Sequence, residues 1–334
     1  MAQKGPEKPS QPEFHLPQPA VLNPPSRSAR ILHMAVKMFM AGRKRLQVRF
    51  GTYNPTAKPE PYQLRSFPQR GYFAVTEVKL PQSRGFYLYP TDATGPHRVV
   101  LQLHGGSYIS PFSHMYAKAA YQYAQAAETK NGAAAVFSLD YRTAPEHPYP
   151  AALEDALDAY DWLLTQGYAP DQIILAGDSA GGGLALALAL KLRDQEVPNC
   201  ARALVLLSPW TDLPAKGTSY QANKYRDPLF QSVPGVPDPE PIAKYYVGDA
   251  DPYDPYLSPA YAQLHDLPPT LALVGQTELL YSDSVKVIRG LQDAGVKARL
   301  QVYPEVIHVW PAAFTRLPES QRAWQQISYF LHEN

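Results

Sequence analysis

Short apolar runs alternate with segments of helical periodicity along most of this chain. The runs are rich in Val, Ile, Leu and Ala, a composition typical of strands. They span residues 98–103, 133–139, 172–176, 202–207, 270–274 and 298–303. Helical patterns cover residues 115–129, 151–166, 180–193, 282–294 and 319–331. This alternation predicts an α/β fold in which a mostly parallel sheet carries helices on both faces.

The segment before the first of these strands adds two strands and a helix. Residues 73–80 and 85–89 alternate in polarity around a short turn, which predicts an antiparallel pair and brings the number of strands to eight. Residues 28–41 place apolar side chains at helical spacing, with Ser28 as N-cap. The basic residues Arg43-Lys44-Arg45 that follow suit a helix C-terminus, and a membrane-surface patch is the alternative interpretation.

Two proline-rich stretches interrupt the pattern. Residues 1–26 combine prolines with polar residues, and we expect an extended, poorly ordered arm there. Residues 212–267 separate two predicted strands, and a connection of this length inside a compact domain is usually a lid or a binding insert.

Composition narrows the functional classes. The chain has 334 residues, with 31 Lys and Arg against 30 Asp and Glu, so no global basic field attracts nucleic acid. The single cysteine, Cys200, cannot form an internal disulfide, and no Cys/His cluster predicts a metal; no cofactor is expected. With no signal-peptide core and no membrane-spanning run, we expect a cytoplasmic protein, either monomer or dimer.

The strongest chemical signal is Gly177-Asp178-Ser179-Ala180-Gly181, which lies between a predicted strand and a predicted helix. In that context Gly-x-Ser-x-Gly predicts a nucleophile elbow, a strained turn that projects the Ser179 hydroxyl above the sheet. The flanking glycines are required because side chains there would collide.

A serine hydroxyl is a poor nucleophile, so Ser179 needs a base and an acid that orients the base. In chain order Ser, acid, His, the base should follow the last strand, where His308 lies, and the acid should follow the strand before it. Glu278 is the favoured acid. Asp283 is the alternative, although its place near a helix start is explained by the helix dipole alone.

The mechanism also needs hydrogen-bond donors for the negative charge that develops on the substrate carbonyl oxygen. Backbone N–H groups suit this role because they are fixed before the reaction. We expect the amides of Gly105, Gly106 and Ser107, after the third strand, and of Ala180, after the nucleophile, to form this oxyanion hole.

These motifs together resemble the hormone-sensitive-lipase-like family of carboxylesterases within the α/β-hydrolase superfamily. The segments Tyr141-Arg142-Thr143-Ala144-Pro145-Glu146 and Ser208-Pro209-Trp210 are similar to that family's motifs, and the resemblance covers about residues 99–310. It departs at Ser107, where the family's loop has Gly, and at Glu278, where Asp is frequent. The resemblance implies one hydrolase domain over residues 27–334, with a helical cap built from about 27–50 and an insert at about 212–250.

The predicted function is a serine carboxylesterase that acts on small esters of short to medium acyl chains through an acyl-enzyme. We expect a short apolar slot to be lined by large side chains from the cap helix and the site loops, namely Met34, Met38, Phe39, Tyr108, Phe112 and Trp210. Amidase or lactonase activity would use the same groups. A non-catalytic ligand receptor is the other alternative, and the retained serine, glutamate and histidine argue against it.

Overall fold

The computed structural model describes residues 24–50, 54, 60–69, 71–91, 98–128, 134–238 and 241–334. Most of the stretch 1–26, predicted to be an extended arm, lies outside the described residues. At the end of that stretch, the backbone N–H and the hydroxyl of Ser26 donate hydrogen bonds to the Glu319 carboxylate, at 2.8 and 3.0 Å. Ser26, just before the first helix, is therefore fixed to the C-terminal helix.

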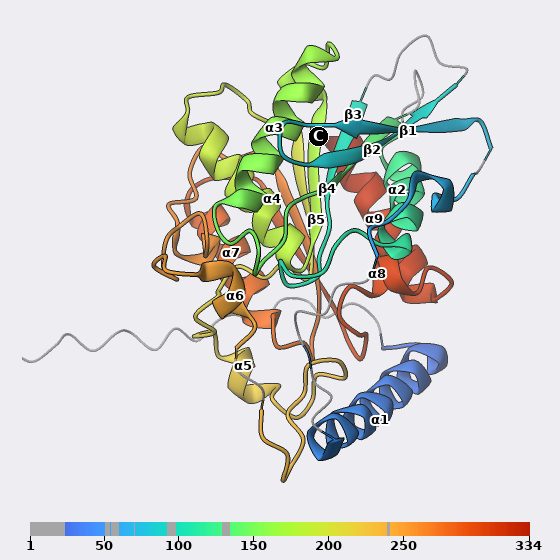
Figure 1. The fold of residues 1–334 in the computed structure, drawn as a ribbon, viewed down its shortest axis with the longest axis vertical. Coiled ribbons are helices and arrows are strands. Elements are labelled where there is room, and N and C mark those ends of the chain that lie inside the picture. The colour runs from blue at the N-terminus through green and yellow to red at the C-terminus, as the bar shows by residue number, and fades with distance from the viewer. Residues whose placement is uncertain are drawn as a thin grey trace, which may run out of the picture.

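An eight-stranded sheet runs through the described part of the molecule (Figure 1). Its strands are β1 Phe73–Lys79, β2 Arg84–Pro90, β3 Arg98–Leu103, β4 Ala134–Asp140, β5 Ile173–Asp178, β6 Ala203–Leu207, β7 Thr270–Gly275 and β8 Ala298–Tyr303. Their spatial order is β1-β2-β4-β3-β5-β6-β7-β8. β1 pairs antiparallel with β2, and β2 with β4, while the remaining neighbours are parallel. The predicted eight-stranded, mostly parallel sheet is confirmed.

Helices cover both faces of the sheet (Figure 1). They are α2 His114–Ala126, α3 Ala151–Thr165, α4 Ala180–Asp194, α7 Tyr281–Asp293, α8 Trp310–Ala313 and α9 Pro318–Glu333, with the 3₁₀ turns η1 Leu64–Ser66, η2 Pro170–Gln172 and η3 Pro259–Tyr261. The apolar side chains of α3, α4 and α7 share one core cluster with one face of the sheet. Those of α2, α8 and α9 form the second core with the opposite face.

Strand register brings distant loops to one edge of the sheet. Leu103 pairs with Gly177, and Asp178 pairs with Leu207, so the loops after β3, β5 and β6 begin side by side. Gly275 pairs with Tyr303, which aligns the loops after β7 and β8 in the same way. Since all these strands are parallel, every predicted catalytic residue follows a strand end on the same edge.

A long helix and an irregular insert lie together beyond this edge (Figure 1). The helix is α1, Arg27–Phe50, and the insert between β6 and β7 carries the short helices α5 Ser219–Ala222 and α6 Ala243–Val247. The Lys44 ammonium lies 2.7 Å from the Asp238 carboxylate, and the Gln231 side-chain amide donates to the Lys37 carbonyl at 2.8 Å. These contacts join two segments that are far apart in sequence.

Helix α1 extends further than the predicted range 28–41 because a single glycine, Gly42, weakens a helix without ending it. Its first turn is also capped by a different residue. The Ala29 N–H donates to the Ser26 hydroxyl at 3.1 Å, so Ser26 takes the capping role that was predicted for Ser28.

Candidate active site

Ser179 lies in the sharp turn between β5 and α4. Its backbone has φ 52° and ψ −122°, a conformation that stores strain in a non-glycine residue. Two glycines allow the turn. A Cβ on Gly177 would lie 2.1 Å from the Gly181 carbonyl oxygen, and a Cβ on Gly181 would lie 2.1 Å from the Leu103 carbonyl oxygen. The turn has the geometry expected of a nucleophile elbow.

His308 and Glu278 meet from the loops after β8 and β7. Nδ1 of His308 lies 2.7 Å from Oε2 of Glu278, and both side chains are buried. The other carboxylate oxygen, Oε1, accepts hydrogen bonds from the Gly275 N–H at 2.6 Å and the Ser208 hydroxyl at 2.9 Å. Both oxygens of the Glu278 carboxylate therefore have hydrogen-bond partners. His308 uses Nδ1 for this contact, which leaves its other ring nitrogen, Nε2, without a contact to Glu278.

Asp283, the alternative acid, faces a different loop. Its Oδ2 accepts hydrogen bonds from the backbone N–H groups of Thr211 and Asp212, both at 2.9 Å, and from the Tyr220 hydroxyl at 3.2 Å. Asp283 therefore fixes the loop after β6, and Glu278 is the carboxylate that contacts His308.

Nearby carboxylates control the charge of His308. Burial by itself lowers the pKa of the imidazole, but the hydrogen bond and negative charge of Glu278, together with the charges of Asp227 and Asp178, outweigh it and raise the pKa above its ordinary value. The site therefore favours the imidazolium, which is the form that His308 adopts after it accepts a proton.

The loop after β3 passes against the nucleophile turn. A Cβ on Gly105 would lie 2.4 Å from Asp178 Oδ2 and 3.1 Å from Ser179 Cβ, so only a glycine fits this approach. Burial raises the pKa of the Asp178 carboxyl at this contact to about 7. The approach places Gly105, one of the predicted donors, directly beside the nucleophile.

The three other predicted donors lie on either side of this contact. Gly106 and Ser107 have φ of 115° and 57°, and the Gly106 carbonyl closes a turn by accepting the N–H groups of Ile109 at 3.1 Å and Ser110 at 3.0 Å. Ala180 is the first residue of α4, where amides have no acceptor within the helix. The structure thus places the backbone of Gly106, Ser107 and Ala180 around the Ser179 turn.

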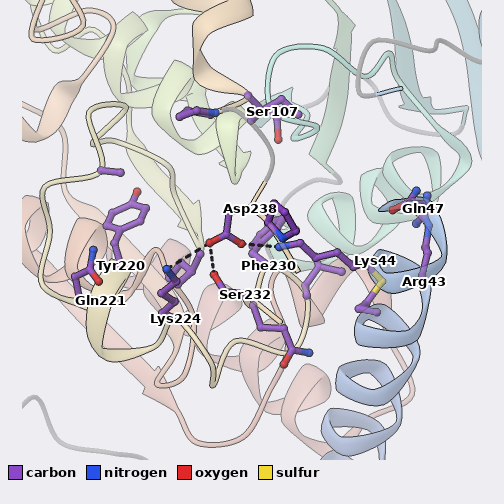
Figure 2. A pocket seen from close by; sticks show the side chains of 18 residues that line it. Arg43, Lys44, Gln47, Ser107, Tyr220, Gln221, Lys224, Phe230, Ser232 and Asp238 are labelled. Atoms are coloured by element: carbon purple, nitrogen blue, oxygen red, sulfur yellow. Dashed lines mark hydrogen bonds and ion pairs between the residues drawn. The ribbon is translucent and has the colours of Figure 1, made fainter. Parts of the chain in front are cut away.

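A cavity of about 790 Å³ includes Ser107 of this loop in its lining (Figure 2). It reaches the site through Ser107, Phe230 and Leu279, and its volume is in the range of small-molecule sites. Helix α1 forms one wall through Met40, Arg43, Lys44 and Gln47, and residues of the insert form the facing wall.

One carboxylate organises the outer part of this cavity (Figure 2). Asp238 lies 2.7 Å from the Lys44 ammonium and 3.4 Å from that of Lys224, and it accepts a hydrogen bond from the Ser232 hydroxyl at 2.8 Å. Burial raises the pKa of Asp238, but these partners outweigh it and hold the pKa below its ordinary value. With Arg43 also in the lining, basic side chains outnumber Asp238 in this part of the cavity.

The predicted apolar slot is wrong on the helix side. Met34, Met38 and Phe39 are 55%, 71% and 69% exposed, and none of them lines the cavity. The helix is rotated so that the face with Met40 and Lys44 meets the insert, because the ion pair with Asp238 and the cavity wall lie on that side.

The predicted slot residues of the site loops are also placed differently. Tyr108 is buried and stacks on Tyr246 of α6 with ring centroids 3.7 Å apart, and Phe112 is buried against Phe86 of β2. Both therefore pack in the cores and not in the cavity. Trp210 is half-buried beside the nucleophile turn, and its backbone N–H donates to the Ser179 carbonyl at 2.8 Å.

Sequence reasoning missed two residues of the insert near the catalytic groups. The Phe230 ring lies 4.9 Å from the His308 ring, edge to face, and Phe230 also lines the cavity. Asp227 accepts the N–H groups of Leu229 and Phe230 through one oxygen and that of Leu279 through the other, at 2.8 to 2.9 Å. The insert shows no periodicity in the sequence, so it offered no signal for either residue.

The signal for Ser208, whose hydroxyl donates to Glu278, was present in the Ser-Pro-Trp motif. Among the described residues, no group of three His, Cys, Asp or Glu is arranged to hold a metal ion.

Comparisons with known proteins agree with this geometry. The model of the alpha/beta hydrolase fold family matches residues 100–312. An acetyl-hydrolase of Streptomyces hygroscopicus is 41% identical over 70% of this chain and 75% of the relative, and an esterase of Acinetobacter venetianus is 31% identical over 80% and 84%. The solved structure of a hormone-sensitive lipase from a metagenome library is 30% identical, has a TM-score of 0.73, and covers 91% of this chain and 98% of that chain.

Proposed function

This chain belongs to the alpha/beta hydrolase fold family, in its hormone-sensitive-lipase-like branch, and is a carboxylic ester hydrolase; from that premise we propose that it cleaves short- to medium-chain acyl esters through Ser179, His308 and Glu278. The observation that carries the proposal is the 2.7 Å contact between His308 Nδ1 and the Glu278 carboxylate at the sheet edge that also carries the Ser179 turn.

In the first half of the reaction, the Ser179 hydroxyl oxygen attacks the ester carbonyl carbon while His308 Nε2 accepts the hydroxyl proton. The imidazolium that forms is stabilised by Glu278, which supports the same proton transfer that the raised pKa of His308 favours. His308 then gives the proton to the departing alkoxide, the carbon–oxygen bond breaks, and an acyl group remains on Ser179.

In the second half, a water molecule gives a proton to His308 and attacks the acyl carbonyl. Collapse of the second tetrahedral intermediate returns the proton to Ser179 and releases the carboxylic acid. Both intermediates carry negative charge on the former carbonyl oxygen. We assign the amides of Gly105, Gly106, Ser107 and Ala180 as its donors, because the Gly105 loop lies against the Ser179 turn and Ala180 begins α4.

We propose that α1 and the insert, about residues 27–50 and 212–250, act as the cap over the acyl or alcohol group. Support comes from the cavity walls: Met40 of α1 and Leu229, Phe230 and Ile242 of the insert supply apolar surface, and Ser107 lies at the catalytic end. An acyl chain that is longer than the apolar part of the cavity reaches the charged Lys44 and Asp238 side chains. These charges disfavour the burial of further methylene groups.

The test is the Ser179→Ala enzyme. We expect kcat/KM for p-nitrophenyl acetate to fall by about a thousandfold or more, since the hydroxyl is the attacking group. Ser110→Ala, which removes the exposed hydroxyl of the neighbouring loop, serves as the matched control and should retain activity. A serine-reactive organophosphate should modify the peptide that carries Ser179. Near-normal activity of Ser179→Ala, or an adduct on another serine, would exclude the proposed mechanism.

A further inference from the structure

Five of the eleven large apolar side chains that are exposed in the described residues lie on the outer face of one helix, α1. Its large apolar side chains, Ile31, Met34, Met38, Phe39 and Leu46, are between 55% and 71% exposed. At 100° per residue they fall within one continuous sector of the helix, with Gly42 among them. A contiguous apolar face of this kind marks an interaction surface, whereas scattered apolar side chains do not.

The charge of α1 is as uneven as its exposure. Residues 27–50 contain seven Lys and Arg and no Asp or Glu, while the rest of the chain has 24 basic and 30 acidic side chains. Arg30 and Lys44 pair with Glu305 and Asp238 on the body of the protein. Arg27 and Arg45 are exposed and lie within the sector of the apolar side chains. The outer face therefore combines apolar and basic groups.

The opposite face of the same helix belongs to the proposed substrate cavity. Met40, Arg43, Lys44 and Gln47 line it, so one helix separates the outer apolar face from the cavity (Figures 1 and 2). An α-helix with its side chains is about 10 Å thick. A surface that bound the outer face would lie about one helix thickness from the proposed substrate cavity.

We propose that the outer face of α1 docks the protein on an anionic lipid surface, with Met38 and Phe39 at the level of the acyl chains and Arg27 and Arg45 at the headgroups. An apolar sector and basic side chains on a helix that itself carries no Asp or Glu form the pattern of interfacial helices that bind negatively charged bilayers. Docking would be peripheral, because no described helix has both the length and the apolar character needed to cross a bilayer.

A second copy of the chain fits this face less well than lipid does. In a symmetric dimer the same patch meets itself, which would bring Arg27 and Arg45 of both copies together without a carboxylate on either helix. Anionic headgroups supply the missing negative charge. This difference selects the lipid surface as the occupant.

The test is sedimentation with vesicles of phosphatidylcholine and phosphatidylglycerol in a 7:3 ratio, compared with vesicles of phosphatidylcholine alone. We expect the full chain to bind the anionic vesicles at least about tenfold more strongly, and the binding to fall as salt rises from 0.1 to 0.5 M because ions screen the headgroup charge. The triple variant Ile31→Ser, Met38→Ser, Phe39→Ser and the double variant Arg27→Glu, Arg45→Glu should each lose about tenfold or more in affinity.

Control variants change exposed large apolar and exposed basic side chains outside α1. The triple variant Leu164→Ser, Tyr253→Ser, Tyr329→Ser alters exposed large apolar residues in other segments of the chain, and Lys79→Glu, Lys118→Glu reverses the charge of two exposed lysines outside α1. Both variants should bind like the unchanged protein. Thermal melting monitored by circular dichroism shows whether every variant is folded. Ser179→Ala should bind vesicles normally, so a failure of the proposed ester hydrolysis would not affect this result.

Absence of binding to anionic vesicles, equal binding to both kinds of vesicle, or equal loss in the controls would overturn the proposal. A dimer that dissociates in the α1 apolar variant, without vesicle binding by the unchanged protein, would assign the face to a second copy instead.

Discussion

The backbone of Ser179 is held in its strained conformation by its neighbours. A non-glycine residue in such a conformation costs about 1–3 kcal/mol. The Ser179 N–H donates to the Leu207 carbonyl at 2.9 Å, and the Ser179 carbonyl accepts the N–H groups of Trp210 at 2.8 Å and Gly183 at 3.1 Å. These hydrogen bonds come from the end of β6, from the loop that follows it and from α4, so the hydroxyl is positioned before any substrate binds.

The pH dependence of hydrolysis follows from His308. A general base must be neutral, so kcat/KM should fall as the pH drops through the His308 pKa, and the raised pKa places the midpoint of that acid limb above about 6.5. Glu278→Gln removes the carboxylate that contributes most to raising the His308 pKa. We expect the midpoint to move to lower pH and kcat to fall by about a hundredfold or more, because the imidazolium loses its partner. Both are read from kcat/KM and kcat profiles between pH 5 and 9.

Asp283→Asn is the matched control for this experiment. It removes a buried carboxylate that holds the loop after β6 and does not contact His308, so the midpoint should stay in place. A shift in Asp283→Asn without one in Glu278→Gln would instead assign the orienting role to Asp283.

At the scale of elements, the closeness of α4 to the loop after β3 determines which glycines can be replaced. Gly181 and Gly42 are both helical, yet a Cβ on Gly181 would lie 2.1 and 2.4 Å from the carbonyl oxygens of Leu103 and His104, while a Cβ on Gly42 would meet no atom within 4 Å. At Gly181, helix α4 is packed against the backbone of another segment. At Gly42, helix α1 is open.

The two Gly→Ala variants should therefore differ in sign. Gly181→Ala should lower the free energy of unfolding by about 3 kcal/mol or more, because backbone atoms of another segment must move. Gly42→Ala should raise it by about 0.5–1 kcal/mol, because alanine favours the helical state. Urea denaturation measures both. A destabilised Gly42→Ala would show that α1 packs differently at that position.

At the scale of the whole molecule, α1 and the insert form the cavity only together. The contacts Lys44 to Asp238 and Gln231 to the Lys37 carbonyl each join residues that are 194 positions apart in sequence. Such exposed ion pairs stabilise a protein by about 0–1 kcal/mol, so we assign the Lys44 contact to positioning and not to global stability.

The orientation of α1 leads to a prediction about acyl chain length. Met40 lines the cavity and Met38 is exposed, so Met40→Trp should fill part of the cavity and shift the preferred p-nitrophenyl ester toward shorter chains, with a severalfold loss in kcat/KM for hexanoate relative to acetate. Met38→Trp adds the same volume on the outer face and should leave the ratio unchanged. Equal shifts in both variants would contradict the observed rotation of the helix.

Local patterns in the sequence determined the strands, their mostly parallel arrangement and the nucleophile turn. Apolar periodicity reports secondary structure directly, and Gly177 and Gly181 are required by contacts within the turn or with the adjoining strand end. The loop positions of Ser179 and His308 follow from the same alternation, because catalytic residues on such sheets follow strand ends. These features depend on short-range sterics that a sequence records.

Packing between distant segments decided which carboxylate contacts His308 and which face of α1 is buried. Glu278 and Asp283 are five residues apart, and the fold turns the first toward His308 and the second toward Thr211. Helix α1 has an apolar face containing Met38, which a sequence pattern alone places inside, yet the ion pair with Asp238 and the cavity wall orient that face outward. Which face of a helix is buried depends on the surface that meets it, and only the tertiary structure supplies that surface.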